Sequence, residues 1–263
     1  MSTPTKVEFA VKMTCQSCVA AVKNSLRDID GVQGVDVDLQ NERVVVTSTL
    51  PTAKVQSLLE SSGRSVLVRG QGPVATAASV GAQHLGAAVA IMLGRSGVTG
   101  LARFTQVEDD KCILEGTVDG LSPGKHGIHI HEYGDISQGC ESVGDHFNPY
   151  QRPHGPPEAE DRHVGDLGNV EADASGRAIF RLEEKVVKVW DVIGRTIVVD
   201  GVEDDYSPAY KSTVRVACGI IARSAGLFEN DKKVCACTGR TMWQEKEDLS
   251  APAPQSAPMT SSL

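Results

Sequence analysis

The spacing of apolar residues changes abruptly near residue 70, so the sequence predicts two folded domains of different class. Residues 1–71 alternate between strand-like and helix-like periods, whereas residues 84–230 contain short strand-like runs between Gly-, Asp- and Pro-rich turns. Residues 72–83 between them carry no charge and are rich in Gly and Ala, which indicates a linker. Residues 231–263 form a tail that we expect to be mostly disordered, because it ends in a Ser-, Ala- and Pro-rich stretch.

The first segment has the element order β-α-β-β-α-β. Val7, Phe9 and Val11 alternate with polar or small residues, which is the period of a half-buried strand. Apolar residues from Val19 to Ile29 then follow at helical spacing. Two strands, a second helix and a fourth strand are predicted over residues 35–39, 43–50, 51–59 and 65–69. This order predicts a ferredoxin-like α+β domain, with two helices on one face of a four-stranded antiparallel sheet.

The middle segment is predicted to be entirely β. Eight short strands separated by frequent turns are typical of a sandwich or a barrel. Two long loops, residues 133–167 and 200–216, interrupt the pattern, and loops of that length need a function or an internal tether. The predicted strands are Ala87–Met92, Val98–Gln106, Cys112–Val118, Gly127–His131, Gly168–Ala172, Ala178–Leu182, Thr196–Val199 and Ala217–Ala222.

Charge and hydropathy argue against several classes of function. The chain has 26 basic and 34 acidic side chains, and this net charge of −8 argues against a nucleic-acid-binding surface. The longest apolar run, Leu85–Leu93, is about half as long as a membrane-spanning helix. Residues 1–6 are polar and do not resemble a secretory signal. We therefore expect an intracellular protein with no membrane span.

The motif Met13-Thr-Cys15-Gln-Ser-Cys18 lies where the first strand meets the first helix. A helix N-terminus favours a thiolate, and two thiolates three residues apart can bind one soft ion. Two ligands are too few for a closed zinc site, whereas low coordination by sulfur suits Cu(I). A thioredoxin-like redox pair and a pair of inert cysteines are the alternatives.

Histidines are concentrated in the second segment, where six of the chain's seven fall between residues 126 and 163. His129 and His131 are predicted to share one face of a strand, because residues i and i+2 point the same way. Imidazoles together with a carboxylate indicate a zinc or copper site rather than a chance surface cluster. The following loop adds His146, His154, His163 and Asp166.

The tail contributes a third thiol motif, Cys235-Ala-Cys237. Two cysteines separated by one residue make a poor disulfide with each other. They can bind Cu(I) together, exchange with a disulfide elsewhere, or be free surface thiols. Cys112 lies in a strand-like run and is predicted to be a buried thiol.

Two resemblances follow from these motifs. Residues 5–70, with the Cys15/Cys18 motif, resemble the heavy-metal-associated domain of copper-handling proteins. Residues 84–223 resemble Cu,Zn superoxide dismutase through HGIHIHEYGD, HFNP, RHVGDLGNV and ACGI, which implies a Greek-key β-barrel with an immunoglobulin-like sandwich topology. This second resemblance implies one Zn(II) site formed by His146, His154, His163 and Asp166. It implies a disulfide between Cys140 and Cys218. It also implies part of a copper site, formed by His129, His131 and His146.

One departure from the dismutase pattern bears directly on function. The family's fourth copper ligand is a histidine, and here Asp200 stands at the matching position. A carboxylate is a hard ligand that stabilises Cu(I) less than an imidazole does, so His129, His131 and Asp200 are read as a vestigial copper site. Asp204 matches the family's carboxylate that links the two metal sites, and Arg215 matches its arginine that guides superoxide to copper. The loop between these two residues also looks shortened. The resemblance therefore implies a structural and docking module rather than an efficient enzyme.

The three parts together resemble the family of copper chaperones for superoxide dismutase. That resemblance implies a metallochaperone, not an enzyme, that binds Cu(I) at up to two sites, Cys15/Cys18 and Cys235/Cys237. It also implies a heterodimer with Cu,Zn superoxide dismutase, copper delivery and help in forming the client's intrasubunit disulfide. A homodimer and an upstream copper donor are left open. The implied location is the cytoplasm, with the nucleus and the mitochondrial intermembrane space as further compartments.

Two alternatives to this function stay open. The first is an active superoxide dismutase with a fused copper-loading domain. The second is a copper buffer with no dedicated client, which would leave the dismutase-like segment without a purpose.

Overall fold

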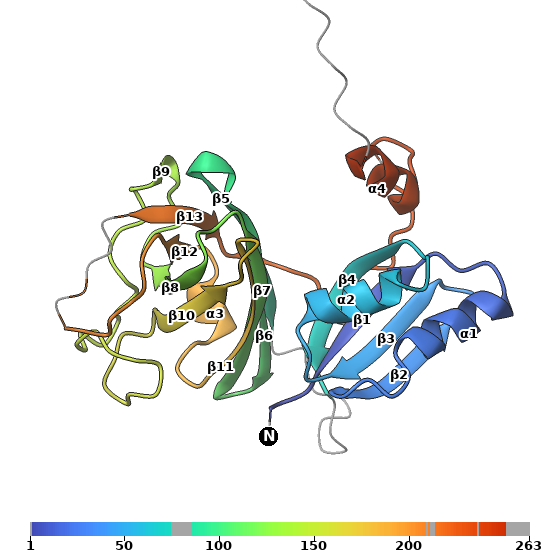
Figure 1. The fold of residues 1–263 in the computed structure, drawn as a ribbon, viewed down its shortest axis with the longest axis horizontal. Coiled ribbons are helices and arrows are strands. Elements are labelled where there is room, and N and C mark those ends of the chain that lie inside the picture. Colours follow the sequence, from blue (N-terminus) through green and yellow to red (C-terminus); the bar gives the residue numbers. More distant parts are fainter. Residues whose placement is uncertain (1, 75–85, 209, 211–213, 236, 251–263) are drawn as a thin grey trace, which may run out of the picture. The chain divides into compact units, whose positions relative to one another are not determined.

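The computed structural model describes residues 2–74, 86–208, 210, 214–235 and 237–250. The chain divides into two compact units, Met1–Asn230 and Asp231–Leu263 (Figure 1). Part of the predicted linker (75–83), of the predicted disordered tail (251–263) and of the altered loop (211–213) lies outside the described residues. Among the described helices, none is both long and apolar enough to cross a membrane.

The first sheet of unit Met1–Asn230 confirms the predicted ferredoxin-like domain. Its four antiparallel strands have the order β2-β3-β1-β4, and both helices pack on one face of the sheet (Figure 1). The first helix is shorter than its apolar spacing suggests, because Asp28 adopts a left-handed conformation and turns the chain before Ile29. The elements are β1 (Thr5–Val11), α1 (Gln16–Ser25), β2 (Val32–Asp38), β3 (Arg43–Ser48), α2 (Thr52–Glu60) and β4 (Val66–Pro73).

The second sheet closes into an eight-stranded barrel, as predicted. Its strands have the order β13-β12-β8-β10-β11-β7-β6-β5, and β5 pairs with β13 to close the ring. A large apolar cluster that includes Phe104, Ile128 and Ile197 fills the interior. The strands are β5 (Ala87–Gly94), β6 (Thr99–Glu108), β7 (Lys111–Asp119), β8 (Gly124–His131), β10 (Asp166–Ala172), β11 (Arg177–Glu184), β12 (Thr196–Asp200) and β13 (Arg215–Ile220).

The last predicted strand, Ala217–Ala222, is interrupted at Ile221. This residue is fully buried and exchanges backbone hydrogen bonds with Gly194 and Arg195, so it leaves the ladder before β14 (Ala222–Arg223) pairs with β5. Several short elements were not predicted, since they depend on tertiary contacts more than on periodicity. They are the 3-10 turn η2 (Arg95–Gly97), β9 (Ser137–Cys140) within the first long loop, and α3 (Val189–Val192).

The tail unit has more structure than the expected disorder. Val234 and Thr241 pair as an isolated bridge, and α4 (Met242–Ser250) follows. Short polar helices of this kind leave little periodic signal in the sequence. Residues 251–263, which contain most of the Ser-, Ala- and Pro-rich stretch behind the prediction of a mostly disordered tail, lie outside the described residues.

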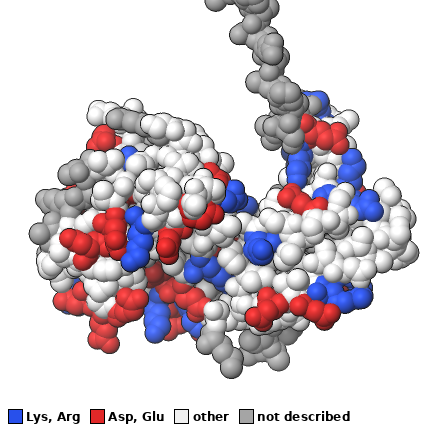
Figure 2. Space-filling model, in the orientation of Figure 1, with Lys and Arg blue, Asp and Glu red and all other residues white. Residues whose placement is uncertain are grey.

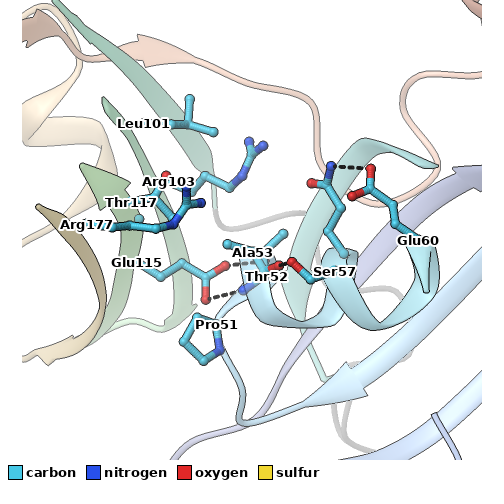
Figure 3. Close-up of a pocket in the computed structure, with 12 residues that line it drawn as sticks. Pro51, Thr52, Ala53, Ser57, Glu60, Leu101, Arg103, Glu115, Thr117 and Arg177 are labelled. Carbon is cyan, nitrogen blue, oxygen red and sulfur yellow. Dashed lines mark hydrogen bonds between the residues drawn. The ribbon is translucent and has the colours of Figure 1, made fainter. Parts of the chain in front are cut away.

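A buried carboxylate joins the two sheets of unit Met1–Asn230. Helix α2 begins after Pro51, whose side chain makes no capping bond. Glu115 of β7 takes that role, because its carboxylate accepts hydrogen bonds from both the backbone N–H and the hydroxyl of Thr52 (Figure 3). Arg181 of β11 pairs with the same carboxylate at 2.7 Å. The barrel therefore supplies the N-terminal cap of a helix in the first sheet.

The surface of the described residues mixes charges of both signs. On the face seen in Figure 2, acidic and basic side chains are interspersed. Several ion pairs lie at this surface, such as Arg177–Asp119 and Lys125–Glu203, both at 2.9 Å. Exposed pairs of this kind contribute little to stability.

Candidate metal-binding sites

The structure brings Cys15 and Cys18 together at the junction of β1 and α1. Their sulfur atoms are 3.2 Å apart, with Cys15 exposed and Cys18 buried. Cys15 is the N-cap residue of α1, and its sulfur lies 3.0 Å from the Ser17 hydroxyl. The preceding Met13 is buried in the domain core, and its N–H donates to Glu42 Oε1 at 3.4 Å. One sulfur is thus accessible to an incoming ion and the other is fixed by the core.

The Cys15 thiol is poised to ionise. Its hydrogen bonds with the Ser17 hydroxyl and then with Cys18 lower the pKa of Cys15 to about 6. The group is therefore largely a thiolate at neutral pH. A thiolate and a second thiol in contact suit a soft monovalent ion such as Cu(I).

A second cluster gathers three imidazoles around one carboxylate. Asp166 opens β10, and the histidines lie in the loop between β9 and β10. Asp166 Oδ1 is 2.9 Å from His146 Nδ1 and 3.0 Å from the Nδ1 atoms of both His154 and His163. One donor atom from each of the four residues lies within 4.8 Å of the others. These are the four residues that the resemblance implies for zinc.

The chemistry of this cluster fits Zn(II). Three imidazole nitrogens and one carboxylate oxygen form a typical tetrahedral zinc donor set. His154 Nδ1 is buried and makes no hydrogen bond with acceptable geometry, although Asp166 Oδ1 is only 3.0 Å away. One carboxylate oxygen cannot align with three donors, so this nitrogen is left without a hydrogen bond. A cation at the centre of the four donors satisfies that nitrogen.

Two members of this cluster have ionisation states that suit a metal, whereas the carboxylates of Asp166 and Asp204 outweigh burial and raise the pKa of His154 to about 9 in the metal-free protein. Burial raises the pKa of Asp166, but the hydrogen bond with His146 and the nearby ring of His154 outweigh burial and hold it well below its usual range. Asp166 is therefore a carboxylate at neutral pH. Burial lowers the pKa of His146, which favours the neutral imidazole that binds metals.

The copper position of the dismutase pattern is closed by carboxylates. His129 of β8 is fully buried, with Nδ1 2.9 Å from Asp200 Oδ2 and Nε2 2.9 Å from Asp204 Oδ2. Carboxylates only accept hydrogen bonds, so both ring nitrogens of His129 donate. Burial alone lowers the pKa of His129, but the bonds to Asp200 and Asp204 raise it above its ordinary value. In the metal-free protein both ring nitrogens of His129 are therefore engaged with carboxylates.

The other two histidines of this position differ from His129. The His131 Nδ1 atom bonds to the Gly144 carbonyl, while Nε2 is buried without a hydrogen-bond partner. Burial lowers the pKa of His131 to about 3, so its ring is neutral. The His146 ring stacks on that of His129 at a centroid distance of 4.0 Å. At this position His131 is thus a neutral imidazole, whereas both nitrogens of His129 face carboxylates.

Asp204 connects the two histidine clusters. Its Oδ1 atom is 3.0 Å from His154 Nε2, while Oδ2 meets His129. The backbone N–H of Tyr206 donates to Asp204 Oδ1 at 2.8 Å. Burial raises the pKa of Asp204, but the bonds with His129 and His154 outweigh it and hold the pKa well below its usual range.

Tyr210 is a member of the site that sequence reasoning missed. Its hydroxyl donates to Asp200 Oδ2 at 3.3 Å, and its ring stacks on His154 at 5.3 Å. An isolated tyrosine in a long loop gives no periodic or motif signal, so only the folded loop reveals this contact. Tyr210 thereby links Asp200 to a residue of the zinc cluster.

The structure joins Cys140 and Cys218 by a disulfide between β9 and β13, with a Cα–Cα distance of 5.7 Å. Arg215 lies beside it and donates to the carbonyls of Cys140 and Gly144 at 2.8 and 3.0 Å. His126 of β8 is buried and belongs to neither histidine cluster. Its ring instead bonds to the Asp200 carbonyl at 2.8 Å and to Ser122, because β8 directs it toward the end of β12.

Three further thiols are free. Burial raises the pKa of Cys112 to about 12, so this thiol is buried as predicted and chemically inert. In the tail unit, Cys235 is half-buried and Cys237 is exposed. The Thr238 hydroxyl lowers the pKa of Cys235, and backbone bonds to Arg240 and Gly239 hold Cys235 in a turn. These features favour a thiolate that can bind a soft metal.

Comparison with family models separates the chain into the same two kinds of domain. The model "Heavy-metal-associated domain" matches residues 8–65. The model "Copper/zinc superoxide dismutase (SODC)" matches residues 98–221. The tail lies beyond both matches.

Curated relatives match almost the whole chain. "Copper chaperone for superoxide dismutase" of Mus musculus is 53% identical over 91% of this chain and 88% of its own length. "Copper chaperone for superoxide dismutase, chloroplastic/cytosolic" of Arabidopsis thaliana is 38% identical over 90% of this chain and 69% of that protein. "Superoxide dismutase 1 copper chaperone" of Debaryomyces hansenii is 30% identical over 94% of this chain and 96% of that protein.

Proposed function

Because the chain belongs to the family of copper chaperones for superoxide dismutase, we propose that it carries Cu(I) to a Cu,Zn superoxide dismutase client. One observation favours a chaperone over an enzyme. Asp200 stands where the dismutase pattern has a copper-binding histidine, and it hydrogen-bonds His129 at 2.9 Å. A barrel closed in this way keeps the dismutase shape while its own copper position is blocked.

Cys15 and Cys18 are the proposed entry site for copper. The exposed Cys15 thiolate attracts Cu(I), and the buried Cys18 completes a two-sulfur site across 3.2 Å. Copper is cargo here, so binding needs to be reversible by exchange with other thiols. An upstream protein donor with a similar thiol pair would supply the ion by the same exchange.

The proposed docking surface is an apolar face where β5 meets β13. Ile91 and Ile220 are 67% and 37% exposed there, which is unusual for large aliphatic side chains on adjacent strands. Gly219 lies against the Ile91 carbonyl so closely that a Cβ would come within 2.2 Å of it. Because Gly219 has no side chain, the face stays flat and backbone atoms form part of it. A client barrel would bind here as a heterodimer, and a homodimer of the free protein would use the same face.

Cys235 and Cys237 are the proposed second Cu(I) site and pass the ion to the client by ligand exchange. The same residues would help form the client's intrasubunit disulfide by thiol–disulfide exchange. Because the tail cysteines are free thiols, this exchange needs a small-molecule disulfide as the two-electron oxidant. A tail thiolate first forms a mixed disulfide with it, and one client thiolate then takes over the tail sulfur and releases the reduced small thiol. The second client thiolate closes the client's disulfide and releases the tail cysteine as a thiol. The lowered pKa of Cys235 supports both roles.

One Zn(II) bound by the four residues of the Asp166 cluster has a structural role in this proposal. It would fix the loop between β9 and β10 to the barrel, and no copper step requires it. The cluster is His146, His154, His163 and Asp166.

We place the protein in the cytoplasm, with the nucleus and mitochondrial intermembrane space as further compartments. The Arabidopsis relative is named chloroplastic/cytosolic.

The proposal is tested by mixing the copper-loaded protein with zinc-loaded, copper-free, reduced superoxide dismutase. We expect dismutase activity only in the mixture. Replacing both Cys235 and Cys237 by Ser should abolish activation while the two proteins still co-elute, and Cys112→Ser is the matched control with full activation. Strong activity of the protein alone would support the enzyme alternative, and activation that survives the double replacement would contradict the tail's role.

A further inference from the structure

The segment that leads from the barrel to the tail lies on the first sheet. Residues 224–230, here called the strap, follow β14, and Ser224 N–H still bonds to the Ala87 carbonyl of the barrel. Two residues later the strap contacts β4. A Cβ at Gly70 would lie 2.1 Å from the Gly226 carbonyl oxygen, so the two backbones meet at a position that only glycine permits. The strap therefore packs closely on the sheet.

Glu8 of β1 receives the strap. Its neighbours Val7 and Phe9 face the helices, so Glu8 faces the opposite side of the sheet. The Glu8 side chain is nevertheless fully buried, and its Oε2 accepts a 2.7 Å hydrogen bond from the Phe228 N–H. Its Oε1 is buried with no hydrogen-bond partner among the described residues. A buried carboxylate with one unpaired oxygen opposes the contact that buries it.

Phe228 of the strap contacts the sheet through its aromatic ring. Its ring is 53% exposed and lies 5.0 Å from the guanidinium of Arg43, the first residue of β3. Phe228 also adopts a left-handed backbone conformation, with φ of 62°, which is unfavourable for an aromatic residue. Attraction to Arg43 and Glu8 is thus balanced by a strained backbone and a buried charge. Such a balance makes the contact reversible.

The strap ends beside the hairpin that supports the first thiol motif. Arg43 pairs with Ala10 across the sheet, near the end of β1 that leads to Cys15. The preceding Glu42 accepts hydrogen bonds from the backbone of Val11 and Met13. Cys235 follows Phe228 by seven residues, so an extended chain reaches at most about 24 Å from this anchor.

We propose that the strap is a reversible anchor that holds the root of the tail on the copper-binding domain, with Glu8, Arg43 and Phe228 as positioning residues for copper transfer. This inference rests on the proposed function. In the transfer, bonds from copper to the sulfurs of Cys15 and Cys18 are replaced by bonds to those of Cys235 and Cys237. Copper stays Cu(I) throughout, so the step needs no oxidant or reductant. Anchoring raises the effective concentration of the second thiol pair near the first.

The anchor itself is tested by amide hydrogen exchange of the full-length protein, without copper or client. Phe228→Ala should speed exchange of the amides of residues 226–229 by about fivefold. Glu8→Gln keeps an oxygen that accepts the Phe228 N–H but removes the buried charge, so exchange there should slow. Trp190→Ala is the matched control, because it removes another exposed ring near a cation, Lys188, on the barrel. Exchange rates unchanged in both test variants would overturn the anchor.

The positioning role is tested by single-turnover activation of copper-free client at increasing client concentration. Phe228→Ala should lower the rate at saturation about fivefold, without changing the half-saturating concentration, since docking uses another face. Phe228→Tyr keeps the ring and should restore the rate. Faster strap exchange with an unchanged activation rate would overturn the positioning role. Failure of the unmodified protein to activate the client would instead contradict the proposed function.

Discussion

At the scale of single residues, Asp200 replaces a histidine of the dismutase pattern and also hydrogen-bonds to the neighbouring His129. Its Oδ2 holds His129 Nδ1 at 2.9 Å, while Asp204 holds the other ring nitrogen. The carboxylate that replaces the family's histidine thus also occupies one nitrogen of a second predicted copper ligand, His129. This physical consequence depends on distances that a sequence does not contain.

Replacing Asp200 by His should raise the intrinsic dismutase activity of the copper- and zinc-loaded protein. The change supplies a fourth imidazole and removes one of the two carboxylates that raise the pKa of His129. Dismutase assays of the protein without client provide the measurement. Asp200→Asn is the control, because it removes the charge without adding an imidazole and should stay inactive. Bound copper without activity in Asp200→His would contradict this explanation.

The reactivity of Cys15 should follow its lowered pKa. Because the pKa is about 6, the thiolate is present above that pH and is lost as the pH falls through it. Alkylation of the metal-free protein, monitored by mass spectrometry of the Cys15 peptide, should be half-maximal near pH 6. Ser17→Ala should move this midpoint upward, since the Ser17 hydroxyl is the largest cause of the shift. Cys112 is the internal control and should stay unmodified in the folded protein, and equal rates for both cysteines would refute the prediction.

At the scale of elements, the most informative contact is the cap of α2. The helix lacks a capping residue of its own, and Glu115 of β7 supplies the carboxylate. The same carboxylate neutralises Arg181, whose side chain is only 8% exposed. A helix of one sheet and a strand of the other are thus mutually dependent.

Replacing Glu115 by Ala should lower the free energy of unfolding by about 2–4 kcal/mol, because the cap is lost and Arg181 keeps a buried, uncompensated charge. Denaturant unfolding is the measurement. Asp119→Ala is the matched control: it breaks the Arg177 pair, in which both side chains are 45% exposed, and should cost under about 1 kcal/mol. Equal losses in the two variants would show that burial of the Glu115 pair does not matter.

At the scale of the whole molecule, a dismutase-like barrel serves a different purpose from that of an enzyme. The four proposed zinc donors lie together, the Cys140–Cys218 disulfide is formed, and Ile91 and Ile220 are exposed, while Asp200 holds one nitrogen of His129. The parts that give a dismutase its shape are separable from the part that gives it turnover. A docking module needs only the former.

Removing zinc should therefore destabilise the barrel without abolishing copper binding at Cys15 and Cys18. A ligand present at a hundred times its dissociation constant stabilises the native state by about 2.7 kcal/mol, so chelation should lower the melting temperature of the barrel by several degrees. Calorimetry with and without chelator at neutral pH measures the shift. His163→Ala should melt at the chelated temperature whether or not chelator is added. The prediction fails if chelator leaves the melting temperature of the unmodified protein unchanged.

The sequence by itself determined the two fold classes, because strand and helix periods are local properties of the chain. It also predicted the thiol pair and the four proposed zinc donors, since these depend on residue type and on matching motifs. Only the tertiary structure decided that Asp204 bridges His129 and His154, that Tyr210 contacts Asp200, and that Glu115 caps α2. Those contacts join residues distant in the chain, and their energies depend on burial and on separations of about 3 Å, which periodicity does not encode.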